Sequence, residues 1–145
     1  METVKINEIK NDFITVKYQG KQIQINITDE LVINEAILNT QLKSSPSNYA
    51  FLCLLRDQAI KKRDQAEKAK DRTYSELWLY YKNSDNKMTN EMATHRTNTS
   101  KKFQLAEDEF LKASAKANQL ISLCRAYESR ERILQTLSAN LRKER

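Results

Sequence analysis

The chain has 145 residues, of which 30% are charged and 39% hydrophobic, with a single glycine and a single proline. So little glycine and proline excludes a loop-rich fold, and this balance predicts a mainly α protein built from long, exposed helices. The formal net charge of +6 favours an anionic partner. Because such helices bury only one stripe each, we expect the chain to associate with copies of itself.

Several classes of protein are not indicated by the sequence. No apolar run approaches the length of a membrane span, and no basic leader precedes an apolar segment, so we expect a cytoplasmic protein without a membrane role. Cys53 and Cys124 lie far apart, and His95 is the one histidine, so we expect buried free thiols and no metal site. The carboxylates at 107–109 point in different directions around a helix, so we expect no catalytic site, no cofactor and no enzyme activity.

Residues 11–28 predict a β-hairpin. β-branched residues alternate on both sides of Gly20, which supplies the turn, and three isoleucines share one face over residues 23–27. Two strands alone are marginally stable in water, so this face must rest on a helix, another subunit or a third strand from residues 4–9. The hairpin is interpreted either as a stabilising cap or as a docking edge for a partner.

Two helices are predicted after the hairpin. Residues 28–30 cap a short helix that reaches about Leu42. Ser45 then caps a long helix, since Pro46 is tolerated in a first turn, and this helix continues to Lys82 over about 55 Å. We therefore divide the chain into a hairpin domain, residues 1–28, and a helical domain, residues 29–145.

A second long helix is predicted from Ser100 to the C-terminus by apolar residues at 3,4 spacing. Before it come a polar loop at residues 83–87 and a short helix from Thr89 to about Thr97. Two long helices joined in this way predict an antiparallel helical hairpin.

The expected helical pairing has two consequences. Pairing Tyr81 with about Ser100 places Cys53 near residue 128, within about a turn of Cys124. Apolar positions late in the second long helix also exceed what one neighbour can cover, so we assign them to subunit assembly. These oligomerisation residues are Tyr127, Ile133, Leu134, Leu137 and Leu141.

The first long helix combines clustered cations with aromatic rings, the pairing that a single-stranded nucleic-acid surface uses. The candidate DNA-binding residues are Lys61, Lys62, Arg63, Lys68, Lys70, Arg72, Tyr74 and Trp78. Four cations are favoured for phosphate contact: Lys61, Lys62, Lys68 and Arg72. Interleaved carboxylates leave two alternatives open, namely that the charges form intrahelical ion pairs and that the rings belong to a core.

The order of these features resembles the UvsY family of recombination mediators of T-even-type phages, over about residues 29–140. In the first half the resemblance is carried by Asp29, Ile33, Asn34, Leu42, Ser45, Pro46, Ser47, Tyr49, Leu52, the lysine-rich helix, and Trp78, Leu79, Tyr80 and Tyr81. In the second half it is carried by Asn90, Glu91, Met92, Ala93, Leu105, Phe110, Ala117, Leu120, Cys124, Ala126 and Arg130.

The resemblance implies a non-enzymatic protein of the infected bacterial host cell that forms a ring-like homo-oligomer. It further implies binding to single-stranded DNA and help for a RecA-like recombinase in displacing a single-strand-binding protein. The family's DNA-contacting basic pair aligns with residues 74–77, which carry no cation, so those contacts are not transferred. The hairpin at residues 11–28 has no counterpart in the family. A coiled-coil structural or scaffolding protein of a phage, without a nucleic-acid role, is the alternative.

Overall fold

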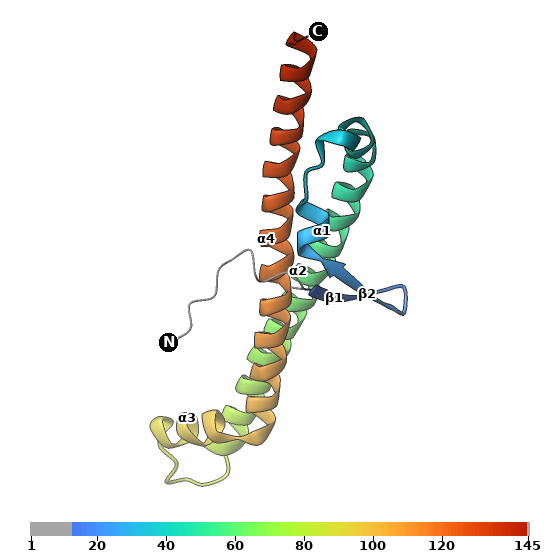
Figure 1. Ribbon diagram of the computed structural model, residues 1–145. Helices are drawn as coiled ribbons and strands as arrows, with labels where there is room; N and C mark the ends of the chain where they lie inside the picture. Colours follow the sequence, from blue (N-terminus) through green and yellow to red (C-terminus); the bar gives the residue numbers. More distant parts are fainter. Residues whose placement is uncertain (1–12, 145) are drawn as a thin grey trace, which may run out of the picture. The chain divides into compact units, whose positions relative to one another are not determined.

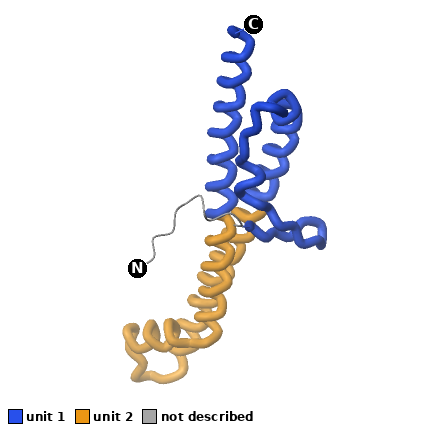
Figure 2. The backbone as a smooth tube through the Cα atoms, in the orientation of Figure 1, with its two compact units in different colours: residues 1–57, 118–145 blue, residues 58–117 orange. Residues whose placement is uncertain are grey.

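The computed structural model describes residues 13–144 and is mainly helical, with an N-terminal β-hairpin (Figure 1). It divides into two compact units (Figure 2): unit 1 is Met1–Asp57 with Asn118–Arg145, and unit 2 is Gln58–Ala117. The elements in chain order are β1 (Phe13–Tyr18), β2 (Lys21–Asn26), α1 (Ile27–Leu31), η2 (Glu35–Ile37), α2 (Leu38–Lys82), α3 (Asn90–Thr99) and α4 (Lys101–Lys143). The predicted fold class is confirmed at this level.

The β-hairpin has the turn that the sequence predicts and part of the predicted apolar face, since Ile27 begins α1 and does not belong to β2. Gln19 and Gly20 have φ values of 50° and 75°, the left-handed pair that a two-residue turn of this hand requires. The antiparallel register places Ile14 opposite Ile25 and Val16 opposite Ile23, so apolar side chains share one face. The third strand expected from residues 4–9 lies outside the described residues.

The hairpin rests on a helix, which is one of the three supports expected. The ring of Tyr18 meets the edge of the Phe51 ring of α2, with centroids 5.3 Å apart and planes at 85°. Ile14, Val16 and Ile25 are buried. The described part of the hairpin therefore belongs to unit 1, together with parts of α2 and α4. The division into two units does not follow the domain boundary expected between residues 28 and 29.

The prediction of one short helix from residues 28–30 to about Leu42 was wrong. This segment instead contains α1, η2 and the start of α2, with extended residues between α1 and η2. The N-cap of α1 is Asn26, whose Oδ1 accepts from the Asp29 amide at 3.1 Å. Asn34 caps η2 in the same way and offers the backbone an alternative to a continuous helix. The Gln41 amide holds the extended residues between these elements, since it donates to the Val32 carbonyl and accepts from the Asn34 N–H, both at 3.1 Å.

The predicted start of the long helix was also wrong. α2 begins at Leu38, and Pro46 lies inside it, where the helix loses one backbone hydrogen bond. Ser45 is not a cap but a buried partner of α4: Arg130 Nη1 donates to Ser45 Oγ at 3.1 Å, and Ser45 donates to Glu131. These tertiary hydrogen bonds favour helical structure before the proline, a contribution that local sequence does not reveal.

The two long helices pair antiparallel within each unit, as predicted for a helical hairpin. In unit 1, the rings of Tyr49 and Tyr127 stack with centroids 5.9 Å apart. In unit 2, Tyr74 meets Phe103 at 5.4 Å, edge to face. The observed pairing is displaced by about one helical turn from the register expected.

Unit 2 also contains α3, which begins and ends close to its predicted limits. Thr89 Oγ1 accepts from the Met92 amide at 3.1 Å and is the N-cap. Ala93 and Thr97, one turn apart, have no exposed surface. This short helix is therefore packed into unit 2 by one narrow face.

The two cysteines are neighbours in unit 1 and are free thiols, as expected. Burial and, to a smaller extent, the adjacent Cys53 raise the pKa of Cys124 to about 11. A hydrogen bond to Glu128, followed by one to Cys53, raises the pKa of Tyr49. Both groups are therefore held in their neutral forms in the folded protein.

We expect Ser45→Ala to lower the free energy of unfolding by about 1–3 kcal/mol, because it removes a hydrogen-bond partner from the buried Arg130 guanidinium. Ser47 is exposed on the same helix, so Ser47→Ala should change stability by less than about 0.5 kcal/mol. Urea unfolding followed by circular dichroism measures both variants. Equal midpoints for the two variants would contradict the assignment of Ser45 as a buried link to α4.

The raised pKa of Cys124 predicts a loss of stability in alkali. Above pH 9 the unfolded thiol loses its proton while the folded thiol keeps it up to about pH 11, so the unfolding free energy falls with rising pH in this window. The raised pKa of Tyr49 also lowers the unfolding free energy as the pH rises. For Cys124→Ala, the free energy of unfolding should fall less steeply between pH 8 and pH 10.5 than it does for the unaltered protein. Chemical unfolding at each pH measures this free energy for both. Parallel pH profiles would show that the Cys124 thiol titrates normally.

Candidate nucleic-acid interface

Four of the predicted phosphate-contacting residues lie exposed on the unit 2 part of α2: Lys61, Lys62, Lys68 and Arg72, which we name the cationic stripe. At about 100° per residue, three of them share the face opposite the buried Ala59, and Lys62, although exposed, lies about 60° from Ala59 around the helix. The stripe covers about 16 Å of helix. Among the described residues, no carboxylate oxygen lies within 4.0 Å of its nitrogens.

The other two predicted cations are engaged within unit 2. Arg63 is half-buried and donates from Nη2 and Nε to Asp64 Oδ1, at 3.1 and 3.2 Å. Lys70 Nζ lies 4.3 Å from the centroid of the Phe110 ring and 3.9 Å from an oxygen of Asp71. The alternative of intrahelical ion pairing therefore accounts for Arg63 and Lys70, and the cationic stripe stays available.

The two predicted stacking rings are half-buried, and each is held by a neighbour. Tyr74 packs edge to face on Phe103 of α4, and Trp78 Nε1 donates to Thr94 Oγ1 of α3 at 3.2 Å. The rings thus serve the core of unit 2 with one side and leave part of their surface to solvent. Tyr80 is the most exposed large ring of this helix end, at 68%, and its centroid is 5.5 Å from that of Tyr81.

Tyr74 and Trp78 border a surface hollow of about 440 Å³, which we name the aromatic hollow and which is lined by Tyr74, Ser75, Trp78 and Leu79. A second hollow of about 370 Å³ shares Tyr74 and Ser75 with it and adds Lys70, Asp71 and Phe103. The aromatic hollow lies just beyond Arg72 along α2, and the second hollow reaches back to Lys70. The aromatic hollow therefore continues the line of the cationic stripe.

Sequence analysis did not identify Ser75 and Leu79 as part of a site. Ser75 directly follows Tyr74 and Leu79 directly follows Trp78, and these two pairs are four residues apart, so all four side chains lie on adjoining helix faces and could have indicated a shared surface. Thr94 and Phe103 were also missed as supports of the rings. No sequence signal identifies them, because their contacts depend on how α3 and α4 pack in unit 2.

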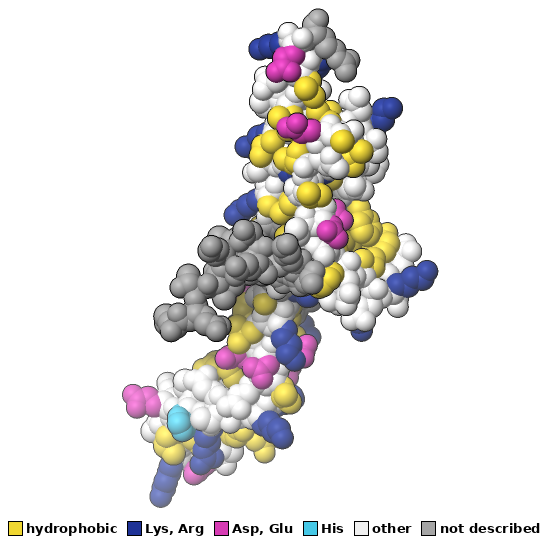
Figure 3. Space-filling model, viewed as in Figure 1, with side chains coloured by type: hydrophobic (Ala, Val, Ile, Leu, Met, Phe, Trp, Pro, Cys, Tyr) yellow, Lys and Arg dark blue, Asp and Glu magenta, His cyan; other side chains and the backbone are white. Residues whose placement is uncertain are grey.

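Other charged groups of unit 2 remain dispersed. On the face shown in Figure 3, basic and acidic side chains are interspersed over this unit. His95 and the carboxylates at 107–109 are exposed, as expected. Within the described range 13–144, no group of three His, Cys, Asp or Glu residues is arranged to hold a metal ion.

The predicted oligomerisation residues fall into two groups, both in unit 1. Tyr127 and Leu134 are 1% and 0% exposed within the protomer, so their assignment to a subunit surface is corrected: their side chains pack inside the unit. Ile133 and Leu141 are 49% and 43% exposed, and Leu137 is half-buried. The 3,4 spacing identified apolar positions correctly but could not tell which of them the same chain covers.

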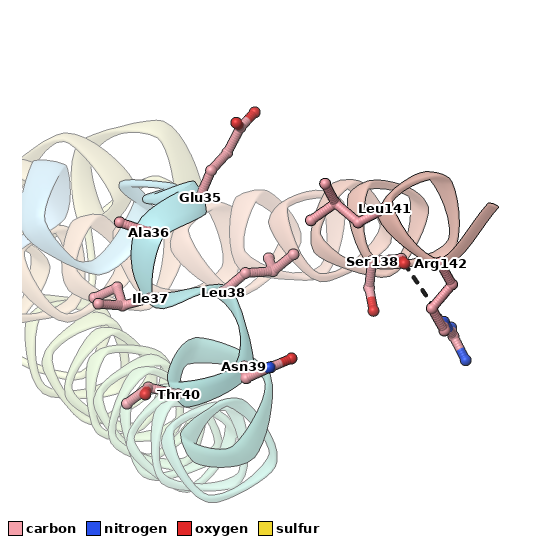
Figure 4. A pocket seen from close by; sticks show the side chains of 9 residues that line it. All are labelled: Glu35, Ala36, Ile37, Leu38, Asn39, Thr40, Ser138, Leu141 and Arg142. Carbon is pink, nitrogen blue, oxygen red and sulfur yellow. Dashed lines mark hydrogen bonds between the residues drawn. The ribbon is translucent and has the colours of Figure 1, made fainter. Parts of the chain in front are cut away.

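Leu141 also borders a hollow of about 640 Å³ in unit 1, between the end of α4 and the segment from η2 to the start of α2. Figure 4 shows Leu38 extending from α2 toward the stretch of α4 that carries Ser138 and Leu141, while Glu35 points away. Ile37, at the same hollow, is 48% exposed. Apolar surface thus stays open at this end of unit 1.

Comparison with protein-family models, with curated proteins and with solved structures finds no match to this chain. Between residues 13 and 144, no helix is both long and apolar enough to cross a membrane. The functional assignment therefore depends on the residues and their geometry, together with the resemblance carried by the sequence.

Proposed function

We propose that this protein is a recombination mediator that binds single-stranded DNA as a homo-oligomer and promotes loading of a RecA-like recombinase in place of a single-strand-binding protein. The observation that carries the proposal is the cationic stripe. Its four side chains are exposed, and within the described residues they have no carboxylate partner, so they are available to a polyanion.

Phosphate binding by such a stripe is driven by the release of counterions from the nucleic acid. Each protomer offers only a few exposed lysines and arginines on one helix, so a single copy should bind weakly. Several copies in one assembly convert later contacts into intramolecular ones and raise the overall affinity without new chemistry. The proposed function thus requires both the stripe and the assembly.

The recombinase and the single-strand-binding protein enter the proposal through the resemblance to the UvsY family. The carboxylates interspersed with the cations also favour moderate affinity, because they oppose non-specific condensation on nucleic acid. Moderate affinity suits a mediator, which must hold a strand and then yield it to another protein.

The double variant Lys61→Ala with Lys62→Ala should weaken binding to a labelled single-stranded oligonucleotide. Removing two phosphate contacts should also flatten the plot of log affinity against log salt by about 1.4, at about 0.7 per contact on a single strand. Fluorescence anisotropy over a salt series measures both effects. The matched control is Lys17→Ala with Lys21→Ala, which removes the same charge from exposed positions of the β-hairpin.

The control variant, Lys17→Ala with Lys21→Ala, should retain nearly all of the affinity for the oligonucleotide and nearly the same salt dependence. Equal weakening by both double variants would mean that net charge alone governs binding and that the stripe is not a site. Absence of binding by the unaltered protein at low salt would overturn the proposed function.

Assembly is proposed to use the exposed apolar residues of α4 in unit 1. Ile133→Asp with Leu141→Asp should place two charges in the subunit contact and reduce the particle to single chains, as measured by light scattering after size-exclusion chromatography. The control Leu111→Asp alters an equally exposed leucine of α4 in unit 2 and should leave the particle mass unchanged. A monomeric unaltered protein at micromolar concentration would contradict the assembly.

The alternative of a phage scaffolding protein is distinguished by the same two measurements. Assembly without binding to a single strand would favour the scaffold, whereas assembly together with binding that depends on the stripe supports the mediator.

A further inference from the structure

The aromatic hollow has features that phosphate binding does not require. Its walls are two aromatic rings and a leucine, and Ser75 adds a hydroxyl at an exposed position. Leu79 is 55% exposed although it is a large apolar residue. A flat apolar group of a ligand is the kind of occupant that such walls favour.

The two rings are held in place before any ligand binds. Phe103 of α4 packs against Tyr74, and the hydroxyl of Thr94 in α3 accepts a hydrogen bond from the indole N–H of Trp78. Because each ring is anchored by a different helix, neither can collapse freely into the hollow. Little side-chain ordering then remains for a ligand to impose, which favours binding.

Charge indicates what kind of flat group approaches. Lys68 and Arg72 lie on α2 about three and two turns before Leu79 and share its helix face, so an anionic backbone held by them passes the hollow. Asp71 lines the neighbouring hollow and would repel a phosphate placed there. The combination fits a polymer with anionic links and flat, neutral side groups.

We propose that the aromatic hollow accepts one unstacked nucleobase of a bound single strand, with stacking on the exposed surface of Trp78 or Tyr74. The inference rests on the proposed DNA-binding function and adds a contact to the base that every base type can make, because each has a π-face. Bases of a duplex are stacked and paired, so they do not reach the hollow. The contact therefore selects single strands over duplexes.

Trp78 is the single tryptophan of the chain, so its fluorescence reports on this hollow without any labelling. The unaltered protein is titrated with an oligothymidine and with an abasic strand of the same length and charge, while anisotropy of a dye on the strand reports binding. We expect the oligothymidine to quench Trp78 and to bind roughly tenfold more tightly, since stacking a base adds this order of affinity.

A variant pair locates the contact. Trp78→Leu should reduce the preference for oligothymidine over the abasic strand, while Tyr80→Leu, which removes a more exposed ring two residues away and outside the hollow, should preserve it. Circular dichroism checks the helix content of both variants. The titration of the unaltered protein stands even if Trp78→Leu fails to fold.

Failure of this inference is distinct from failure of the proposed function. If both strands bind with equal affinity and leave Trp78 fluorescence unchanged, the hollow takes no base, and DNA binding by the stripe still stands. If neither strand binds at low salt, both proposals are overturned. If Tyr80→Leu abolishes the preference as fully as Trp78→Leu, the base stacks elsewhere.

Discussion

The packing of α2 against α4 determines what the rest of the structure can present. In each unit one face of α2 packs against α4: Tyr49 stacks on Tyr127 in unit 1, and Tyr74 packs on Phe103 in unit 2. A helix that buries one stripe must leave the opposite stripe in water. The placement of each charged residue relative to the buried stripe, rather than its mere presence in the helix, therefore decides whether it is available to a partner.

The cations of α2 show this sorting directly. Arg63 and Lys70 lie toward the buried side, where an aspartate and the Phe110 ring engage them, whereas Lys61, Lys68 and Arg72 lie on the outer side. A surface ion pair between neighbouring residues is worth little in stability, but it does reduce the charge that a polyanion meets. Of the six cations in the sequence, four are thus exposed without a carboxylate partner among the described residues, which is a more modest surface than the composition indicates.

Hydrophobic periodicity predicted the β-hairpin and two long helices, the cap at Thr89 predicted α3, and the short connection predicted that the long helices pair, because each of these signals is local. They failed where tertiary contacts override local signals. The buried hydrogen bonds of Ser45 to Arg130 and Glu131 accompany a helix that continues through Pro46. Likewise, spacing identified Tyr127 and Leu134 as apolar helix positions, but only the fold shows that unit 1 covers them. The rings of the aromatic hollow are supported by Thr94 and Phe103, and no local sequence pattern connects these two residues to Trp78 and Tyr74.

The half-buried state of Tyr74 and Trp78 reconciles the two roles that the sequence left open for them. A fully buried ring would stabilise unit 2 but offer no surface, and a fully exposed ring would lose orientation and pay more side-chain entropy on binding. Anchoring each ring on one side, by Phe103 or by the Thr94 hydroxyl, gives rigidity while part of the ring stays open to solvent. Core packing therefore uses one part of each side chain and leaves another part for the proposed base contact, and the contact with the core is what makes the exposed part a defined surface.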